Sequence, residues 1–517
     1  MKKRKGPLVL FIVILVIILV AYFGKGVLFE KRQKSTSDTK GVKEQVNWAG
    51  DGYLGYAFLR TTEMKKQLAR QGIGLNFEND NGDYATRLQK FNKKEYDFIV
   101  LPVNSYLEHG LKYKFPGVIV AAISESKGAD AIVGFEDVMP TGRINDLNNP
   151  DLKIYYTPAS PSSFLLDLTI TDFALDELEN SSGWRREANG SEEVFEYARK
   201  ATRNRSIGDA FVMWEPEVTK AINQLKLKKI WGSDQFGGYI IDVFVFHRDY
   251  VAKKPEVIKT FLKTYFRVLS YYSSRNEEMV KELSKIGDIN KDIIESMVGN
   301  IDWYSLDENC TNLFDIPIAI GMPSRDGIIN SIYACSDVMV RMGTMNDEPE
   351  DPYSLINSTF LEELKDEEVR SVSNATAAEE IEFTPLSESQ WKKLNEIGVM
   401  RVKPITFQSG TNVLDFQGEE IVDKVAQMLI TNYPGYRVAI RGHTGQGDEK
   451  ANLELSKQRA DVVMQRLIAV HGIQPERLHA EGMGASQPPA KKSGENPRAY
   501  YLRWARVEFV LLDNASF

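Results

Sequence analysis

The order of apolar and polar residues divides the chain into one long apolar segment and many shorter, alternating ones. Residues 7–23 are apolar throughout, and they follow four cations at positions 2–5. A helix of about 20 apolar residues crosses a hydrocarbon core of about 30 Å, so this run is just long enough to span a membrane. The pattern therefore predicts a transmembrane helix over residues 1–24, followed by a polar linker over residues 25–45.

The charges around this segment predict its orientation. Basic residues concentrate on the cytoplasmic side of a spanning helix, so we expect a cytoplasmic N-terminus, a single pass through the inner membrane and a periplasmic bulk. A cleaved signal peptide is the alternative, but its apolar region is usually shorter and ends in small residues. The segment here ends in Ala21-Tyr22-Phe23-Gly24, a poor cleavage site, so an uncleaved anchor is our interpretation.

From residue 46 to residue 345, short strand-like runs alternate with helix-like stretches. The runs at 97–101, 153–156 and 210–213 are mostly apolar or aromatic, and a helix-like stretch follows each. Repeated strand-then-helix order is typical of βαβ units and of a largely parallel sheet covered on both faces. Since this region is longer than one core usually holds, we predict two α/β lobes.

Acidic residues accumulate between residues 346 and 387, which predicts a solvated linker with a short helix around residues 360–372. Beyond it, residues 388–517 predict a third unit, an α/β sandwich of βαβαββ order. Its expected strands and helices lie, in chain order, at 405–407, 419–432, 436–441, 452–470, 477–481 and 506–512.

Composition excludes several classes of protein. The chain has 517 residues and a formal net charge of −8, which does not favour nucleic-acid binding. Its two cysteines, Cys310 and Cys335, predict either one bridge or two buried thiols rather than a zinc site. The five histidines are scattered, and no nucleophile stands beside a base. We therefore predict no enzyme, no catalytic residue, no metal and no cofactor.

Polar and aromatic residues follow several strands of the central region. Ligands of open parallel sheets bind beyond the carboxyl ends of the strands, against helix N-termini. The hydroxyl-rich turn at residues 157–163 precedes a helix, so its N–H groups and the helix dipole favour a carboxylate, sulfonate or phosphate. The candidate ligand-binding residues are Trp48, Asp51, Tyr53, Ser160, Ser162, Ser163, Trp214 and Glu215. The alternative is structural: the serines cap a helix, the tryptophans fill core and the acids are surface charges.

This region resembles the solute-binding proteins of the nitrate, sulfonate, taurine and thiamine-precursor transport group. The resemblance covers about residues 46–314 and rests on the segments 47–56, 126–133 and 209–216. It implies a type II periplasmic-binding-protein-like fold, whose two lobes close over a small molecule. Transport receptors diffuse or hang from a lipid, whereas this module follows a predicted helix anchor, which favours sensing or scaffolding over delivery to a permease.

The C-terminal unit resembles the OmpA-like peptidoglycan-binding domain. The motifs are Gly442-His443-Thr444, the run 452–463 that contains Arg459, Gly482-Met483-Gly484 and the closing strand at 506–509. The resemblance implies that Arg459 takes the carboxylate of the diaminopimelate side chain. Gly445 stands where the family has an aspartate for the ammonium group, so Asp448 is expected to replace it.

The predicted peptidoglycan-binding residues are Arg459, Asp448, Asn452 and Thr444. The alternative is that Arg459 pairs with a neighbouring acid and the domain only packs against a partner protein. The predicted function is a membrane-anchored protein that binds a small anionic or zwitterionic solute, tethers to peptidoglycan and reports to an envelope partner. The competing function is a structural envelope component whose solute-binding fold serves as a protein–protein platform.

Overall fold

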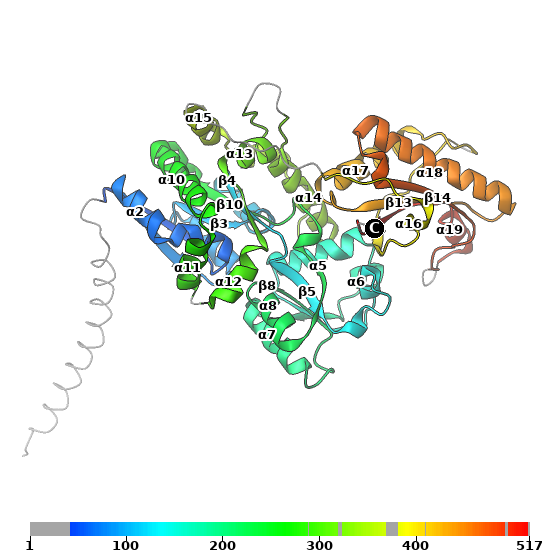
Figure 1. The fold of residues 1–517 in the computed structure, drawn as a ribbon, viewed down its shortest axis with the longest axis horizontal. Helices are drawn as coiled ribbons and strands as arrows, with labels where there is room; N and C mark the ends of the chain where they lie inside the picture. The colour runs from blue at the N-terminus through cyan, green and yellow to red at the C-terminus, as the bar shows by residue number, and fades with distance from the viewer. Residues whose placement is uncertain are drawn as a thin grey trace, which may run out of the picture.

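The computed structural model describes residues 42–287, 289–318, 323–368, 381–408, 410–491 and 495–514. These residues form two α/β lobes, lobe 1 and lobe 2, and a C-terminal module beside them (Figure 1). The predicted anchor at residues 1–24 lies outside the described residues, as does most of the predicted linker at 25–45.

The structure corrects the transmembrane part of the predicted fold class and the single-pass inner-membrane localisation. Across the described ranges, no helix is both long enough and apolar enough to cross a membrane. The longest of these helices, α18 (Glu449–His471), has 23 residues but carries charged side chains along its length.

Lobe 1 is built on a six-stranded sheet of order β11-β4-β10-β3-β1-β2. Its strands are β1 (Glu44–Gly50), β2 (Ile73–Asn79), β3 (Phe98–Pro102), β4 (Gly117–Ser126), β10 (Ile241–His247) and β11 (Ile301–Trp303). The helices around it are α2 (Thr62–Arg70), α3 (Tyr84–Asn92), α4 (Val103–Gly110), α9 (Arg248–Lys253), α10 (Pro255–Ser273), α11 (Asn276–Gly287), α12 (Lys291–Val298) and α13 (Leu306–Glu308). Strands β3 and β10 are buried along their whole length, because helices cover both faces of the sheet.

Lobe 2 has a five-stranded sheet of order β7-β6-β8-β5-β9. Its strands are β5 (Asp130–Gly134), β6 (Ile154–Tyr156), β7 (Arg185–Glu187), β8 (Ala210–Trp214) and β9 (Lys228–Gly232). Its helices are α5 (Pro161–Asp172), α6 (Asp176–Glu179), α7 (Gly190–Ala201) and α8 (Glu217–Leu225). Helix α5 is buried on all sides, because it packs on this sheet and against other helices.

The two lobes repeat one topology. In lobe 1, β2-β1-β3 run parallel and antiparallel β10 separates β3 from β4; in lobe 2, β7-β6-β8 run parallel and antiparallel β5 separates β8 from β9. The chain passes between lobes at residues 127–129, the first crossover, and at residues 233–240, the second crossover. The hydroxyls of Ser126 and Ser233 lie 2.7 Å apart and hold the two crossovers together. These features confirm the predicted two-lobed α/β fold.

Two later helices complete this part of the molecule. Helix α14 (Gly327–Arg341) packs against α4 of lobe 1 and α5 of lobe 2, so it bridges the lobes. Helix α15 (Thr359–Glu368) lies within the predicted acidic linker and packs against α10. Lys259 of α10 bonds Glu363 at 2.9 Å and Glu367 at 3.0 Å, which explains why an acidic helix folds back here.

The C-terminal module is a four-stranded sheet of order β12-β15-β13-β14. Its elements are α16 (Glu388–Trp391), β12 (Glu396–Met400), α17 (Phe416–Thr431), β13 (Arg437–His443), α18, β14 (Leu478–Gly484), α19 (Pro497–Leu502) and β15 (Arg506–Leu512). The first strand of this sheet, β12, lies before residues 405–407, so the prediction of a strand at 405–407 is wrong. That run follows Pro404, which has no N–H to donate to a sheet.

The C-terminal module docks on lobe 2 through buried polar contacts. Asp172, at the end of α5, accepts a hydrogen bond from the Tyr433 hydroxyl, and its backbone carbonyl accepts one from the Arg401 N–H at 2.6 Å. The Arg401 guanidinium also bonds Asp176 at 2.7 Å and Glu179 at 2.6 Å. These bonds fix the end of α5 against the module.

The same module also holds the second crossover. The Asn432 side chain donates to the Gly237 carbonyl at 2.9 Å, and the Gly237 N–H donates to the Asn432 carbonyl at 2.8 Å. The Tyr436 hydroxyl donates to Gln235 at 2.5 Å. The C-terminal module therefore contacts one of the two segments that must bend if the lobes move apart.

We expect Tyr433→Phe to weaken this docking, because it leaves the buried Asp172 carboxylate without one of its donors. The loss of one hydrogen bond to a buried carboxylate costs about 1–3 kcal/mol, and it should lower the melting temperature of the full chain by several degrees in calorimetry. Tyr353→Phe is the matched control, because Tyr353 is 57% exposed whereas Tyr433 is 1% exposed. Equal melting temperatures for the two variants would contradict the role of the Tyr433 hydroxyl.

Candidate functional site

Segments of both lobes meet around one small space, the interlobe cavity. Its volume is about 20 Å³, which is room for one or two waters. The residues that line it are Asp51, Tyr53, Tyr56, Tyr84, Pro102, Asp130, Pro161, Trp214, Ile240 and Asp242. Both lobes and the second crossover therefore contribute to the lining.

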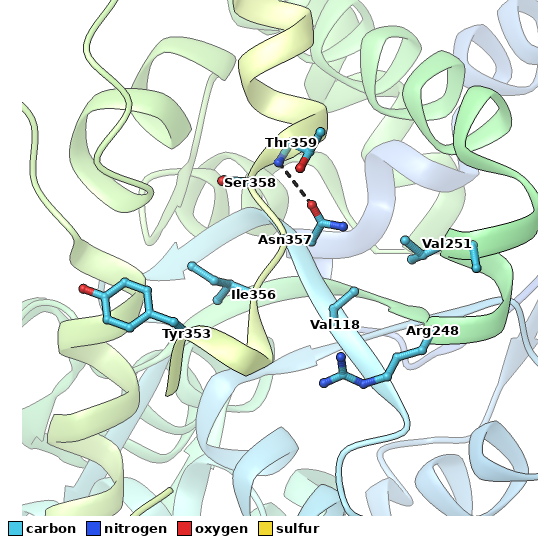
Figure 2. A pocket seen from close by; sticks show the side chains of 9 residues that line it. Val118, Arg248, Val251, Tyr353, Ile356, Asn357, Ser358 and Thr359 are labelled. Carbon is cyan, nitrogen blue, oxygen red and sulfur yellow. Dashed lines mark hydrogen bonds between the residues drawn. The ribbon is translucent and has the colours of Figure 1, made fainter. Parts of the chain in front are cut away.

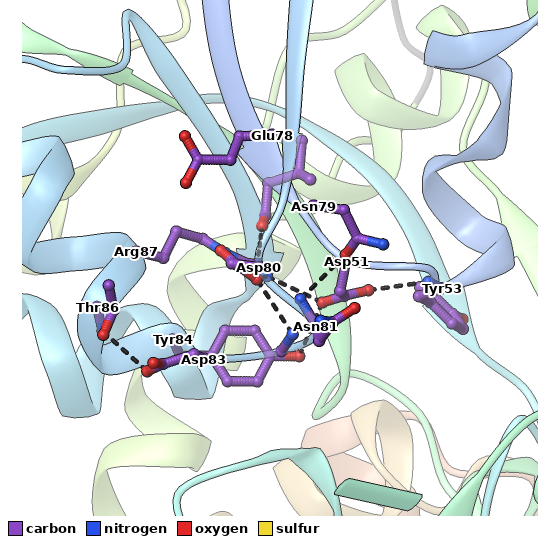
Figure 3. A network of polar contacts seen from close by, with 12 residues as sticks. Asp51, Tyr53, Glu78, Asn79, Asp80, Asn81, Asp83, Tyr84, Thr86 and Arg87 are labelled. Carbon is purple, nitrogen blue, oxygen red and sulfur yellow. Dashed lines mark hydrogen bonds and ion pairs between the residues drawn. The ribbon is translucent and has the colours of Figure 1, made fainter. Parts of the chain in front are cut away.

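One of the three acids that line the cavity is paired within the protein (Figure 3). Asp51 follows β1, and its Oδ2 lies 3.1 Å from Nη2 of Arg87, a fully buried residue of α3. Arg87 also donates from Nε to Asp80 at 2.6 Å and from Nη1 to the Val100 carbonyl at 2.5 Å. The guanidinium is thus used by lobe 1 itself, and its single charge faces two carboxylates.

The other two acids of the cavity have no cationic partner among the described residues. Asp130 is 3% exposed and Asp242 is 2% exposed. Asp130 Oδ2 accepts from the Ser126 hydroxyl at 2.7 Å, and Asp242 accepts from the hydroxyls of Tyr56 and Ser124. Burial raises the pKa of Asp130 to about 7 and raises the pKa of Asp242 well above its usual range. Repulsion by Glu215 and Asp51 also raises the pKa of Asp130, and repulsion by Asp130 and Asp51 that of Asp242.

Two polar atoms of the lining have no hydrogen-bond partner among the described residues. They are the Tyr53 hydroxyl and Oδ1 of Asp130, and both are buried. The Tyr53 ring packs edge-on against Tyr56, with ring centres 5.2 Å apart. Buried polar atoms normally find a partner, so these two mark where a bound group would make its bonds.

The structure brings only part of the predicted cleft set together. Asp51, Tyr53 and Trp214 line the cavity. Trp48 instead packs in the core of lobe 1, with its ring centre 4.3 Å from that of Phe77. Glu215 does not line it and accepts hydrogen bonds from the Thr219 hydroxyl and the Asn300 side chain at 2.7 and 3.1 Å.

The three predicted serines lie at the N-terminus of α5. Ser160 and Ser163 form a capping box, in which the Ser163 hydroxyl accepts from the Ser160 N–H at 3.0 Å. The Ser160 hydroxyl in turn accepts from the Ser162 N–H at 3.2 Å. Two of the serines therefore cap the helix, whereas the buried Ser162 hydroxyl has no partner in the described part of the chain.

The predicted cleft set lacked seven residues of the lining, and four of these have polar side chains: Tyr56, Tyr84, Asp130 and Asp242. Asp242 lies in β10, where every other residue except the terminal histidine is apolar and all seven are buried. An acid inside such a run is a signal in itself, because an unpaired buried carboxylate is costly and is usually functional. The tyrosines reach the cavity only through packing of η1 (Leu54–Arg60) and α3, which the sequence does not reveal.

A second hollow of about 500 Å³ lies on the surface of lobe 1, where residues 353–359 cross β4 and α9 (Figure 2). The Arg248 guanidinium beside it donates to the carbonyls of Phe115 and Ser354 at 3.1 and 2.8 Å. Asn357 accepts from the Thr359 N–H at 3.1 Å. Because these polar groups already have partners within the protein, the interlobe cavity is the stronger candidate.

The C-terminal module presents Arg459 on α18 with an unsatisfied charge. The guanidinium is half-buried over the Phe407 ring at 4.8 Å, and it donates to the Thr411 carbonyl from Nε and Nη2 at 3.1 and 3.0 Å. No carboxylate of the described residues pairs with it, and burial lowers its pKa. The alternative in which Arg459 forms an ion pair with a neighbouring acid is therefore wrong for the described chain.

The other predicted wall-binding residues surround the loop before α18. Asn452 lies seven residues before Arg459, so both project from one face of the helix, and its side chain donates to the Gly445 carbonyl at 3.0 Å. Asp448 caps α18 by accepting from the Ala451 N–H at 2.7 Å. The Thr444 hydroxyl is buried without a partner among the described residues.

A close helix contact explains one glycine of the C-terminal motifs. A Cβ at Gly442 would lie 2.0 Å from the Ser456 carbonyl oxygen, so α18 packs directly on β13 only because position 442 has no side chain. This contact places α18, and with it Arg459, beside the loop at 444–448.

The two cysteines are buried thiols rather than a bridge. Cys335 of α14 donates to the Tyr239 carbonyl at 3.3 Å, and burial raises its pKa to about 12. A thiol of such high pKa is unreactive near neutral pH.

The described chain consists of a two-lobed α/β region and a C-terminal module that matches the OmpA family. Residues 406–501 match the model of the OmpA family. Over 108 residues, 21% of this chain and 47% of the other, the chain is 33% identical to the probable lipoprotein YiaD of Escherichia coli (strain K12). Over 103 residues, 20% of this chain and 27% of the other, it is 34% identical to the outer membrane porin F of Pseudomonas fluorescens. The chain thus spans less than half the length of these relatives.

Solved structures similar to the two lobes include three periplasmic binding proteins. The aliphatic sulphonate binding protein SsuA of Escherichia coli has 13% identity and a TM-score of 0.45, over 66% of this chain and 97% of that one. A putative sulfonate-binding SsuA of Methylobacillus flagellatus KT has 14% identity and a TM-score of 0.46, over 64% and 96%. The nitrate-binding protein NrtA of Synechocystis PCC 6803 has 11% identity and a TM-score of 0.44, over 62% and 88%.

We expect stability to fall between pH 5 and pH 7 because of Asp130. Its pKa is about 7 in the folded protein, above the usual value of 3.8, so in this range the folded state keeps a proton that the unfolded state has lost. Asp130→Asn removes this contribution, which amounts to about 2–3 kcal/mol over two pH units. Chemical unfolding at both pH values measures it, and parallel pH profiles for variant and wild type would contradict the buried acid.

Proposed function

We propose that the protein is a solute sensor of the cell envelope, which holds peptidoglycan through its OmpA domain and a small solute between its lobes. The OmpA match over residues 406–501 and the two-lobed fold support the two binding roles. The observation that carries the sensing role is the docking of the C-terminal module on the second crossover. Solute-driven movement of the lobes would act directly on a segment that the wall-binding module contacts.

Helix α5 gives this coupling a physical path. Its first residue, Pro161, lines the interlobe cavity, and its last residue, Asp172, bonds Tyr433 of the C-terminal module. The helix has 12 residues, so it spans about 18 Å, and it is buried throughout. A rigid, enclosed helix transmits a displacement at one end to the other, because packed cores deform little. Closure over a solute and binding to the wall are therefore linked in this proposal, each altering the other's affinity.

The proposed binding to peptidoglycan is supported by Arg459, whose guanidinium pairs with no carboxylate of the described residues. A half-buried guanidinium without a carboxylate partner in the described chain suits a carboxylate from outside, which it binds with two parallel hydrogen bonds. The unpartnered Thr444 hydroxyl and the exposed Asp448 lie at the loop that precedes the same helix. We propose that Arg459 takes a carboxylate of the wall peptide and that this loop contacts the rest of it.

A second candidate function is favoured by the small volume of the cavity. At about 20 Å³, the space between the lobes is nearly filled by the protein's own tyrosines and tryptophan. A permanently closed cleft would suit a structural component of the envelope whose lobes serve as a platform for other proteins. The sensor is our preferred proposal, because unpaired polar atoms and carboxylates of like charge are poor filling for a purely structural core.

We expect Arg459→Ala to lower retention of the full chain on purified peptidoglycan sacculi by at least about tenfold, because the variant loses a charged, two-donor contact. Arg466→Ala is the matched control on the same helix, since Arg466 already pairs with Asp423 at 2.8 Å. Cosedimentation over a series of sacculus concentrations measures both. If Arg459→Ala and wild type cosediment equally, the assignment of Arg459 is wrong.

A further inference from the structure

We propose that the interlobe cavity is a site for a primary ammonium group, so that the solute is an amine or an amino-acid-like zwitterion and not a simple anion. This inference rests on the proposed function, because it names the chemical class of the solute held between the lobes. It also departs from the sequence-based expectation, which admits a purely anionic solute.

The first step is the balance of charge. Three carboxylates line the cavity, and within the described chain only Asp51 has a cation beside it. Asp80 shares that cation, so Arg87 cannot offset Asp130 or Asp242 as well. A buried acid without a counter-charge either takes up a proton or waits for a cation. A solute that carries only negative charge would add to this repulsion.

The second step concerns the oxygen atoms of the lining that can accept hydrogen bonds from a ligand. An ammonium group has three N–H donors and no acceptor, so it needs three oxygen acceptors around it. Oδ1 of Asp130 and the Tyr53 hydroxyl are buried in the lining without a partner in the described chain. Asp242 offers a third oxygen, since its Oδ2 has only a weak bond of 3.3 Å from Ser124. The aromatic residues Tyr53 and Trp214 also line the cavity, and aromatic rings attract a cation that lies over their faces.

The third step is size. A cavity of about 20 Å³ accepts a group as small as an ammonium head but excludes a guanidinium or a quaternary ammonium. A metal ion is also disfavoured, because the described residues contain no group of three or more His, Cys, Asp or Glu side chains placed to hold one. The remainder of the solute therefore occupies space that opens when the lobes separate slightly.

The acids come from different parts of the fold. Asp51 belongs to lobe 1, Asp130 begins the first strand of lobe 2, and Asp242 follows the second crossover. A cation among them is attracted to acids of both lobes at once, whereas without it burial favours the protonated forms of Asp130 and Asp242. Binding of the ammonium group is thus the interaction that would hold the lobes closed.

Four compounds with the same carbon chain test the proposal on the full-length protein: 1-aminobutane, 4-aminobutanoate, butanoate and 1-butanol. Thermal shift and isothermal titration calorimetry at pH 7.5 measure binding. We expect 1-aminobutane and 4-aminobutanoate to raise the melting temperature, with butanoate and 1-butanol without effect. Asp130→Asn should weaken binding of the two amines at least about tenfold, because a charge-assisted bond is lost.

Two further variants separate a binding role from a structural one. Tyr53→Phe removes a hydroxyl that has no partner among the described residues, so the folded protein should keep its stability while the affinity for the amines falls severalfold. Glu217→Gln is the control, since this buried acid of lobe 2 pairs with Lys220 at 3.0 Å outside the cavity, and it should bind the amines like wild type.

The outcomes distinguish this inference from the proposed function. If butanoate stabilises the protein as well as 1-aminobutane does, solute binding stands and the ammonium site is wrong. If none of the four compounds binds and Tyr53→Phe has the same melting temperature as wild type, the ammonium site and the solute-binding role are both wrong. The protein–protein platform is then supported. If the amines bind equally well to wild type and Asp130→Asn, they bind elsewhere, and the assignment to this cavity is overturned.

Discussion

The buried carboxylate of Asp172 holds three parts of the molecule in one arrangement. It ends α5 of lobe 2, it accepts a hydrogen bond from Tyr239 of the second crossover at 3.3 Å, and it accepts another from Tyr433 of the C-terminal module. Its own backbone carbonyl takes the Arg401 N–H. Burial of a carboxylate is unfavourable unless hydrogen-bond donors surround it. Asp172 therefore keeps these donors together in one place. The position of the OmpA domain relative to the cleft depends on this cluster.

Through this cluster, the interlobe cavity and the Arg459 site belong to one connected structure. In the cleft, Asp130 and Asp242 lack a counter-charge within the described chain, and each lies next to a crossover between the lobes. In the C-terminal module, no acid of the described residues pairs with the charge of Arg459. Within the described chain, the cavity has acids without a cation and the C-terminal module has a cation without an acid. Helix α5 and the second crossover connect the two sites. The proposed role, a solute sensor fixed to the wall, accounts for both features.

Much of the fold could be predicted from the sequence, because strand-then-helix order and the spacing of motifs are local properties. The alternation after residue 46 predicted the two lobes, and the motifs around Gly442 and Arg459 predicted the OmpA domain. The cavity lining was harder, since Tyr56, Tyr84, Asp130 and Asp242 meet only through packing of distant segments. Trp48 and Ser160 had the right residue types at the right strand ends, but core packing and helix capping use them instead.

The central claim is that the docked C-terminal module governs the separation of the lobes. Distances between spin labels on Lys66→Cys of α2 and Lys200→Cys of α7 measure it by pulsed electron resonance, with selective labelling because both native cysteines are buried. Asn432→Ala removes the side-chain bond to Gly237 of the second crossover. The account predicts one narrow, short distance in the otherwise unmodified chain and a broader, longer distribution in the Asn432 variant. Identical distributions would contradict it.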